Sequence, residues 1–341
     1  MKKVIEQEET LLEWPPPRPK FDFQPGKFKF IDLFAGVGGM RLGFEAAGGE
    51  CVFTSEWDKD CQKTYEANFG ELPDGDITKV DERDIPDFDV LLAGFPCQPF
   101  SSIGQRQGFK HETQGTLFYD VLRIIQHKEP KAFLLENVVG LLNHDKGNTF
   151  KIIEKNLKAE GYILHHKVLD SSDYGVPQVR KRIYIIGFKQ KLFKDDPVFY
   201  WPTPMKKKVG IGKYVENNVS GFEISKKLQD SYIFKINDGR PQIITQDSDF
   251  QVKTLVASYH KIQRLTGTFV ADGKTGLRLL TENECKAIMG FPKSFKIPVS
   301  RTQMYRQMGN SVAVPVIIEI AKEITSTLLA AKLIKAQKKS A

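Results

Sequence analysis

One cysteine stands in a setting that suits a nucleophile. Residues 94–101 read Gly-Phe-Pro-Cys-Gln-Pro-Phe-Ser and follow the apolar run Val-Leu-Leu-Ala at 90–93. That run is typical of a buried strand, so Cys97 should stand at the carboxyl end of a strand, where open α/β sheets bind ligands. Pro96 and Pro99 stiffen the backbone on both sides of the thiol. The pattern predicts covalent chemistry at Cys97, with the role of a small buried hydrophobe as the alternative.

An acid and two arginines are expected beside this thiol. The apolar residues 133–135 lead into Glu136, and parallel strands share a direction, so Glu136 and Cys97 should emerge at the same sheet edge. A glutamate there can have a raised pKa and act as an acid or hydrogen-bond donor. Arg180 and Arg182 alternate at the period of a strand and should face one side, where they would favour the thiolate and bind a phosphate or carbonyl oxygen. Solvated surface charges are the alternative for all three.

A second group of residues suits a nucleotide-like ligand. Residues 32–39 read Asp-Leu-Phe-Ala-Gly-Val-Gly-Gly, and such glycines let the backbone approach a ligand closely at the start of a helix. Glu56 follows Gly36 by 20 residues (56 − 36 = 20), as an acid that accepts hydrogen bonds from ribose hydroxyls would. Trp57 offers a flat face to a purine, and Asp76 could bind an adenine amino group. A tight turn, a solvated acid and a helix cap are the alternatives.

Two further observations concern the kind of ligand and the last helix. A dinucleotide fingerprint would need glycine three residues after Gly38, but Arg41 stands there, which disfavours hydride transfer. Asn310 and Ser311 precede the last apolar helix pattern and are expected as helix-start residues.

The elements that must position these residues alternate between strand and helix. Strands are expected at 28–34, 51–54, 89–93, 131–135, 161–169 and 182–188, and helices at 40–47, 59–68, 116–127 and 148–159. Repeated β-α units predict an α/β fold with a doubly wound, mostly parallel sheet.

The same reading divides the chain into segments. Residues 1–28 contain Trp-Pro-Pro-Pro-Arg-Pro and are expected to be an extended arm. Residues 29–189 should form the catalytic and cofactor-binding domain, and 190–275 a small irregular domain of strands and loops. Regular structure should return over 276–332, with a capped helix from Thr281 to Gly290 and a last helix from about 314 to 332. Residues 333–341 form a basic tail.

Composition places the chain among ordinary globular proteins and hints at a polyanionic partner. Of 341 residues, 40% are hydrophobic and 27% charged, and the net charge is +8. Residues 190–275 hold 14 Lys and Arg against 9 Asp and Glu, so +5 of the +8 lies there. The four cysteines show neither a Cys-x-x-Cys pair nor a metal spacing, which favours a reducing cytoplasm and no metal. No apolar stretch approaches the roughly 20 residues of a membrane span.

Six ordered blocks resemble the C5-cytosine DNA methyltransferase family, in its bacterial and phage type with a single target-recognition domain. The blocks are residues 32–39, 94–101, 136–138, 178–182, 278–292 and 307–312. The resemblance implies the Rossmann-like fold of class I S-adenosylmethionine-dependent methyltransferases, with residues 190–275 as the target-recognition domain. It also implies that residues 98–113 form a mobile loop that closes over DNA.

The resemblance further implies a role for each residue. Cys97 would add to carbon 6 of a flipped-out cytosine, with Glu136, Arg180 and Arg182 around that base, and carbon 5 would take the methyl group. The cofactor would be S-adenosylmethionine, with S-adenosylhomocysteine as product. Its pocket would be lined by Phe34, Gly36, Gly38, Gly39, Glu56, Trp57, Asp76, Pro96, Leu117, Asn310 and Ser311. The DNA would be contacted by Gln98, Ser101 and Thr254.

The expected partner is therefore double-stranded DNA, acted on by a monomer in restriction-modification or epigenetic marking. A cognate restriction endonuclease as a second partner is left open. Two alternatives remain. The tRNA-methylating branch of the family carries a Cys-Phe-Thr signature in its recognition region, whereas residues 190–275 contain no cysteine. A catalytically inactive DNA-binding protein is the other alternative, and the intact Cys97, Glu136 and Arg182 argue against it.

Overall fold

The computed structural model of the chain describes residues 26–96 and 117–336. Its main feature is a mixed sheet with the strand order β2-β1-β3-β4-β6-β5. The strands β2, β1, β3 and β4 run parallel, whereas β6 is antiparallel to both β4 and β5. The bounds are β1 (Gly26–Leu33), β2 (Gly49–Ser55), β3 (Val90–Ala93), β4 (Ala132–Val138), β5 (Tyr162–Asp170) and β6 (Lys181–Lys189), and a short β9 (Lys335–Ala336) pairs with the start of β1. Each strand expected from the sequence is present, and the mostly parallel sheet is confirmed.

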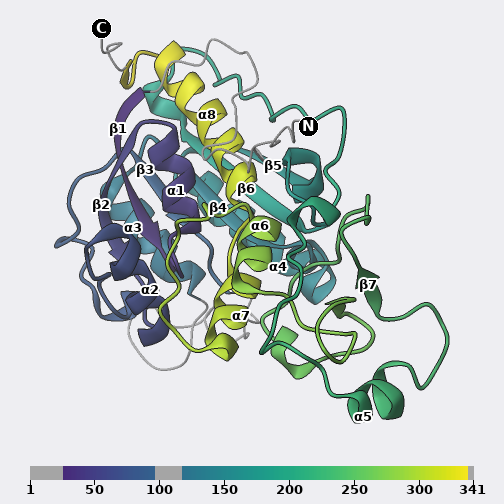
Figure 1. Cartoon of the computed structure of the whole chain (residues 1–341). Helices are drawn as coiled ribbons and strands as arrows, with labels where there is room; N and C mark the ends of the chain where they lie inside the picture. The colour runs from purple at the N-terminus through teal and green to yellow at the C-terminus, as the bar shows by residue number, and fades with distance from the viewer. Residues whose placement is uncertain (1–25, 97–116, 337–341) are drawn as a thin grey trace, which may run out of the picture.

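Helices cover both faces of this sheet, which is therefore doubly wound as expected. Alternate residues of β1 belong to two different apolar cores, because successive side chains of a strand point to opposite faces. Phe30 packs with α1 and α8 on one face, where these two helices lie side by side (Figure 1), and Ile31 packs with α3 and α4 on the other. The helices are α1 (Gly39–Ala46), α2 (Lys59–Phe69), α3 (Phe118–Lys128), α4 (Asn148–Ala159) and α8 (Val314–Ala330).

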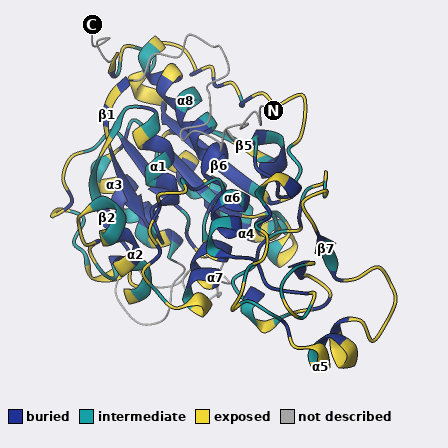
Figure 2. Cartoon of the chain, in the orientation of Figure 1, coloured by how far each residue is buried: buried dark blue, intermediate teal, exposed yellow. Residues whose placement is uncertain are grey.

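Residues 190–280 form the irregular part of the fold. The only strands in this part are β7 (Gln242–Ile244) and β8 (Thr268–Val270), which pair in parallel. The remainder consists of loops, 3₁₀ turns, the short α5 (Lys226–Leu228) and a π-helical turn (Gln229–Ile233). Figure 1 shows β7 and α5 to one side of the sheet, and Figure 2 shows many exposed residues around α5.

The apolar core of this irregular part continues into the returning helices. Ile224, Ile244 and Phe269 share one cluster with side chains of α6 (Glu282–Met289) and α7 (Arg301–Asn310). The expected start of α6 is confirmed, since Thr281 and Glu284 form a complete capping box, and Gly290 ends the helix in the left-handed conformation. Within the described residues, none of the helices has the length and apolarity needed to span a membrane.

One expectation about the last helix is wrong. Asn310 and Ser311 do not begin a helix: Asn310 is the last residue of α7, and Ser311 follows it with extended backbone. The amide of Ser311 donates to the carbonyl oxygens of Gln307 and Met308, which closes α7. The next helix, α8, begins at Val314 with a proline in its first turn, where the missing N–H of proline is tolerated.

Candidate active site

The candidate site lies where three neighbouring parallel strands end together. Leu33 of β1 pairs with Ala93 of β3, and Ala93 pairs with Leu135 of β4. The residues that follow these paired positions are the glycine turn, the segment 94–96 and Glu136, which lies within β4 near its last residue, Val138. The sheet therefore brings together the three motifs that the sequence placed at one edge, as ligand-binding α/β sheets do. Cys97, Gln98 and Ser101 lie outside the described residues, as does the whole of the expected loop 98–113.

Glu136 is the acid that β4 contributes to this site. Its Oε1 lies 3.1 Å from Nε of Arg182, and both side chains are largely buried, with 12% and 15% of their surfaces exposed. Its Oε2 lies near Gly94, since a Cβ on that glycine would be 3.8 Å away. Burial raises the pKa of Glu136, while the charges of Arg182 and Arg180 oppose the shift. The glutamate thus points toward the backbone that leads into Cys97, and burial makes it easier to protonate than an exposed glutamate.

The two arginines occupy different environments. Arg182 reaches Glu136, whereas Arg180 is 3% exposed and donates to backbone carbonyl oxygens. Nη1 of Arg180 lies 3.1 Å from the oxygen of Leu255, and Nη2 lies 3.1 Å from that of Gly309 and 2.6 Å from that of Ser311. Burial lowers the pKa of Arg180 to about 10, and the neighbouring Arg182 adds to this shift. Both terminal nitrogens of Arg180 are therefore used inside the protein, whereas its Nε has no hydrogen-bond partner among the described residues.

Asn137 is a residue of the site to which the sequence reasoning assigned no role. Its Nδ2 donates to the carbonyl oxygen of Phe95 at 2.9 Å, and its Oδ1 accepts from the amide of Val138 at 2.8 Å. This buried side chain ties the end of β4 to the segment that precedes Cys97. A polar residue directly after Glu136 in an otherwise apolar strand was the available signal.

Glu56 and the glycine turn form the second half of the site. Oε2 of Glu56 accepts from the amide of Gly36 at 2.7 Å, and Oε1 accepts from the amide of Asp58 at 2.8 Å. Burial raises the pKa of Glu56, and these two backbone bonds partly offset the shift. Gly36 and Gly38 have φ values of 56° and 87°, which a residue with a side chain rarely adopts. The described chain leaves open space within 4 Å of a Cβ placed on Gly36.

Asp32, at the end of β1, is a second residue to which no role was assigned. It is 1% exposed, and neither carboxylate oxygen has a hydrogen-bond partner among the described residues. Burial is the main reason that its pKa rises to about 8, and the negative charge of Glu56 contributes in the same direction. The nearby backbone amide and the positive charge of Arg41 oppose this rise but do not cancel it, so the pKa of this buried acid stays well above the ordinary range.

The other residues expected in the cofactor pocket occupy several different environments. Trp57 is 75% exposed beside Glu56, and Ser311 reaches the glycine turn, since a Cβ on Gly39 would lie 3.0 Å from Ser311 Oγ. Asp76 accepts from the amide and hydroxyl of Thr78, so it serves as a helix cap, the ordinary alternative. The remaining positions are Phe34 at a positive φ, Pro96 and Asn310 at the surface, and Leu117 at the start of α3.

Thr254, the expected DNA contact in the irregular part, lies beside the arginine segment. Its hydroxyl donates to the carbonyl oxygen of Val179 at 2.7 Å. An open hollow is lined here by Val179, Gln251, Val252, Lys253 and Thr254.

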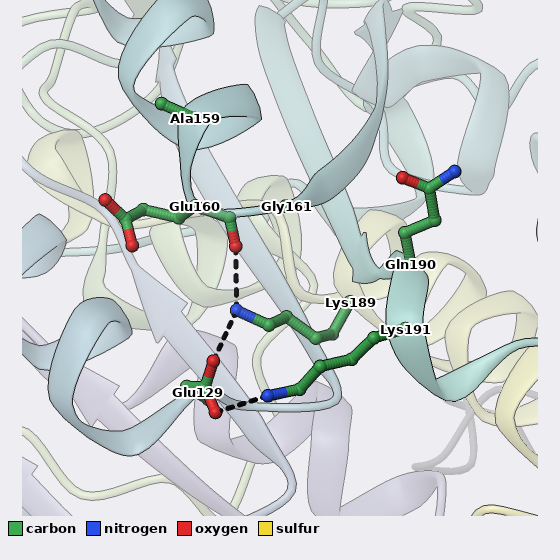
Figure 3. A pocket seen from close by; sticks show the side chains of 7 residues that line it. All are labelled: Glu129, Ala159, Glu160, Gly161, Lys189, Gln190 and Lys191. Carbon is green, nitrogen blue, oxygen red and sulfur yellow. Dashed lines mark hydrogen bonds and ion pairs between the residues drawn. The ribbon is translucent and has the colours of Figure 1, made fainter.

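A second hollow lies at the opposite ends of strands β4 and β6 from Glu136, and its lining includes Glu129, Lys189 and Lys191 (Figure 3). Glu129 accepts from Lys189 at 2.8 Å and from Lys191 at 2.6 Å, and Lys189 also donates to the carbonyl oxygen of Glu160. Glu129 precedes β4 and Lys189 ends the antiparallel β6, so this cluster is remote from Glu136 at the other end of β4. Its lysines are paired with an acid of the protein, and it is not part of the candidate site.

The sequence matches the family model of C-5 cytosine-specific DNA methylases over residues 28–326. The chain belongs to this family. It is 59% identical over 307 residues to the Type II methyltransferase M.BsuFI of Bacillus subtilis, covering 90% of this chain and 75% of that protein. It is 54% identical over 326 residues to the Type II methyltransferase M.MspI of Moraxella sp, covering 96% and 77%. Membership confirms the resemblance and identifies the chain as a DNA cytosine-5-methyltransferase.

Solved structures agree with the fold. A Spodoptera frugiperda DNMT2 mutant superposes with a TM-score of 0.71 at 24% identity, covering 88% of this chain and 99% of that one. The S. pombe Dnmt2 methyltransferase gives a TM-score of 0.70 at 21% identity, covering 89% and 99%. These similarities confirm the α/β fold.

Proposed function

We propose that this methyltransferase transfers a methyl group from S-adenosylmethionine to carbon 5 of a flipped-out cytosine in a short, specific sequence of double-stranded DNA. One observation carries the proposal. The Glu136–Arg182 pair lies at the carboxyl end of β4, and the glutamate faces the backbone that leads into Cys97. An acid with a raised pKa and a cation thus stand together where a pyrimidine ring would meet a thiolate.

The chemistry requires each of these residues. Carbon 5 of cytosine is a weak nucleophile because the ring is aromatic. Addition of the Cys97 thiolate to carbon 6 breaks that aromaticity and makes carbon 5 enamine-like. Carbon 5 then takes the methyl group, and loss of its proton with elimination of the thiolate restores the ring. Cys97 is therefore needed in every turnover but is not consumed.

Glu136 and Arg182 would stabilise the charge that develops on the ring. The raised pKa of Glu136 allows it to hold a proton and donate it, or a hydrogen bond, to ring nitrogen 3. Arg182 would donate to the carbonyl oxygen of the base while its Nε keeps the glutamate in place. Asn137 would support both by holding the carbonyl of Phe95, two residues before Cys97.

The second half of the site fits S-adenosylmethionine. The cofactor, when bound, supplies a methyl group on a sulfonium cation. Asp32 is a buried acid whose two oxygens, unpaired among the described residues, are free to accept or donate a hydrogen bond near the cofactor, and Glu56 retains lone pairs that can accept from ribose hydroxyls. Gly36 leaves open space for close approach, and Trp57 presents an exposed ring to a purine. The further pocket residues proposed are Phe34, Gly38, Gly39, Asp76, Pro96, Leu117, Asn310 and Ser311.

The DNA would meet the basic irregular part. We assign target recognition to residues 190–275 and catalysis to 29–189 together with 276–332. The base must leave the helical stack to reach the sheet edge, because its carbon 6 is not accessible to a side chain inside a duplex. Gln98, Ser101 and Thr254 are the proposed contacts to the displaced nucleotide and its neighbours. Both relatives are named Type II methyltransferases, which supports a role in restriction-modification.

Bisulfite sequencing of DNA from cells that express the protein tests this function. We expect protected cytosines at one short sequence, and no such signal with Cys97→Ala. A uniform absence of protected sites with the wild-type protein would contradict the proposal. The same purified protein offered duplex DNA and tRNA with labelled cofactor should transfer label to DNA, and transfer to tRNA alone would favour the alternative branch.

A further inference from the structure

Residues 177–180 connect the irregular part of the fold to the sheet through backbone hydrogen bonds. The amide of Val252 donates to the oxygen of Pro177 at 2.8 Å, and the amide of Val179 donates to the oxygen of Val252 at 2.9 Å. Thr254 Oγ1 adds a third bond to the oxygen of Val179. Residues 252–254 are therefore held alongside the segment that leads into β6.

Gln178 strengthens this attachment with its side chain. It is fully buried, and its Oε1 accepts from the amide of Leu255 at 2.7 Å. Its Nε2 donates to the carbonyl oxygen of Ile288 at 3.1 Å, near the end of α6. One side chain thus fixes Leu255 relative to the catalytic part.

Arg180 bridges two segments that carry different proposed ligand contacts. Nη1 binds the oxygen of Leu255, directly after Thr254. Nη2 binds the oxygens of Gly309 and Ser311, on either side of Asn310. Thr254 is a proposed DNA contact, whereas Asn310 and Ser311 are proposed cofactor contacts. A single buried guanidinium therefore connects the two.

The same two segments touch without any intervening side chain. A Cβ on Gly309 would lie 2.2 Å from the backbone nitrogen of Ala257, a distance that no side chain could occupy. Because Gly309 and residues 255–257 are in backbone contact and share the guanidinium of Arg180, displacing one segment would leave buried polar groups unpaired. The two segments should move as one body.

We propose that Arg180 is a positioning residue that couples cofactor binding to DNA binding. This inference rests on the proposed function, since it uses the cofactor and DNA contacts assigned there. A ligand that orders residues 309–311 also orders 254–257 through Arg180, so the second ligand meets a segment already in place. Coupling between two binding equilibria is reciprocal, and each ligand should raise the affinity for the other by the same factor.

The test measures that factor directly. Dissociation constants of S-adenosylhomocysteine are determined calorimetrically with and without a saturating DNA duplex that contains the methylated sequence. The wild-type protein should show coupling of at least about fivefold, within the range of typical allosteric pairs. Arg180→Lys keeps the charge but cannot span three carbonyl oxygens, and it should reduce the factor to near one. Coupling retained in this variant would overturn the proposal.

Arg264→Lys is the matched control. Arg264 is similarly buried, and its guanidinium donates to the oxygens of Ile233 and Ile236 within a single stretch of the irregular part. It bridges no cofactor segment, so the coupling factor should be unchanged even if stability falls. An equal loss of coupling in both variants would show a general effect of destabilisation and would also overturn the proposal.

A measurement on the wild-type protein covers the case in which Arg180→Lys does not fold. Hydrogen exchange should slow at the amides of residues 255–257 when S-adenosylhomocysteine alone is added. Unchanged exchange there, with protection confined to the glycine turn and 309–311, would overturn the coupling role but leave the proposed function intact. A wild-type protein that binds no S-adenosylhomocysteine would instead contradict the cofactor assignment.

If Arg180 contacted the base directly, kcat would fall in Arg180→Lys with the coupling factor preserved, which also counts against the proposal.

Discussion

The sheet and the irregular region of residues 190–280 are stabilised in different ways. In the sheet, backbone ladders and apolar side chains dominate, and all four residues of β3 are buried. The irregular region has only the short β7–β8 ladder, and buried arginines supply further bonds between its segments. Arg278 is fully buried and binds both carboxylate oxygens of Glu284 at 2.9 Å, Asp272 at 2.8 Å and the backbone of Glu216.

This difference indicates which substitutions should affect catalysis and which should affect stability. A ladder holds strand ends in place whatever side chains follow them, so catalytic residues can stand there at little expense to stability. A loop region held by single polar side chains depends on each of them. Substitutions at the sheet edge should therefore change activity more than stability, and substitutions of the buried arginines should do the reverse.

The largest expected effect is on catalysis by Glu136→Gln. The amide keeps the shape but cannot deliver a proton to ring nitrogen 3, so kcat should fall by about 10²–10⁴-fold. The melting temperature should fall less than in a variant that removes a buried partner outright, because the amide oxygen can still accept from Nε of Arg182 and the β4 ladder is untouched. Single-turnover methyl transfer measures the first quantity and calorimetry the second.

Glu129→Gln is the control for that prediction. It makes the same chemical change at the opposite sheet edge (Figure 3), next to Lys189 and Lys191. Its kcat should equal that of the wild type. A similar loss of kcat in both variants would mean that Glu136 acts through the fold rather than on the base.

Arg278→Met should produce the largest loss of stability. Removing the guanidinium leaves Glu284 buried without its partner, and breaking a buried pair in this way typically costs about 3–5 kcal/mol. Denaturant unfolding measures the loss. Arg301→Met, at an exposed arginine, should stay within about 1 kcal/mol of the wild type. Equal losses in the two variants would contradict the importance of the buried arginine.

Asp32→Asn should change how stability depends on pH. The folded protein retains a proton on Asp32 up to about pH 8, whereas the unfolded chain releases it near its ordinary pKa. Folded protein then binds more protons than unfolded protein, so the contribution of Asp32 to stability falls as pH rises across this window, by at most about 1.4 kcal/mol per pH unit. The amide cannot titrate, and urea unfolding from pH 5 to 8 should show a flatter profile for the variant. A steeper profile would contradict the assignment.

The smallest expected effect is that of Thr281→Ala. The change removes the cap bond to the amide of Glu284 at the start of α6 and the bond that the hydroxyl donates to Oε2 of Glu216. Loss of such a cap typically costs about 1 kcal/mol. Thr281→Ser keeps the hydroxyl and should retain most of the stability in the same denaturant titration.

Much of the site could be predicted because local patterns set it. Apolar runs ending in Glu136 and at residue 93 predicted two strands, and parallel pairing brought their ends together. The spacing from Gly36 to Glu56 predicted an acid that accepts hydrogen bonds from ribose hydroxyls. The structure places Glu56 beside the glycine turn, where its Oε2 accepts from the amide of Gly36 at 2.7 Å, and the ribose contact itself stays a prediction. In each case the strand period and the direction of the chain were sufficient.

Other features depend on residues far apart in the sequence. Asn310 and Ser311 looked like helix-start residues by type, yet the local hydrogen bonds close α7 instead. Asp32 carries an ordinary side chain whose unusual state arises from burial between neighbouring strands. The bonds of Arg180 to Leu255, 75 positions away, and to Ser311, 131 positions away, follow no local pattern.

The amino-acid sequence by itself determined the elements, their order and which reactive groups stand at their ends, because these follow from the periodicity of apolar residues and the chemistry of short motifs. Only the tertiary structure decided which groups are paired, which are left without a partner and which are used to join segments. Those outcomes depend on packing between distant parts of the chain, where burial removes water and makes each remaining hydrogen bond consequential.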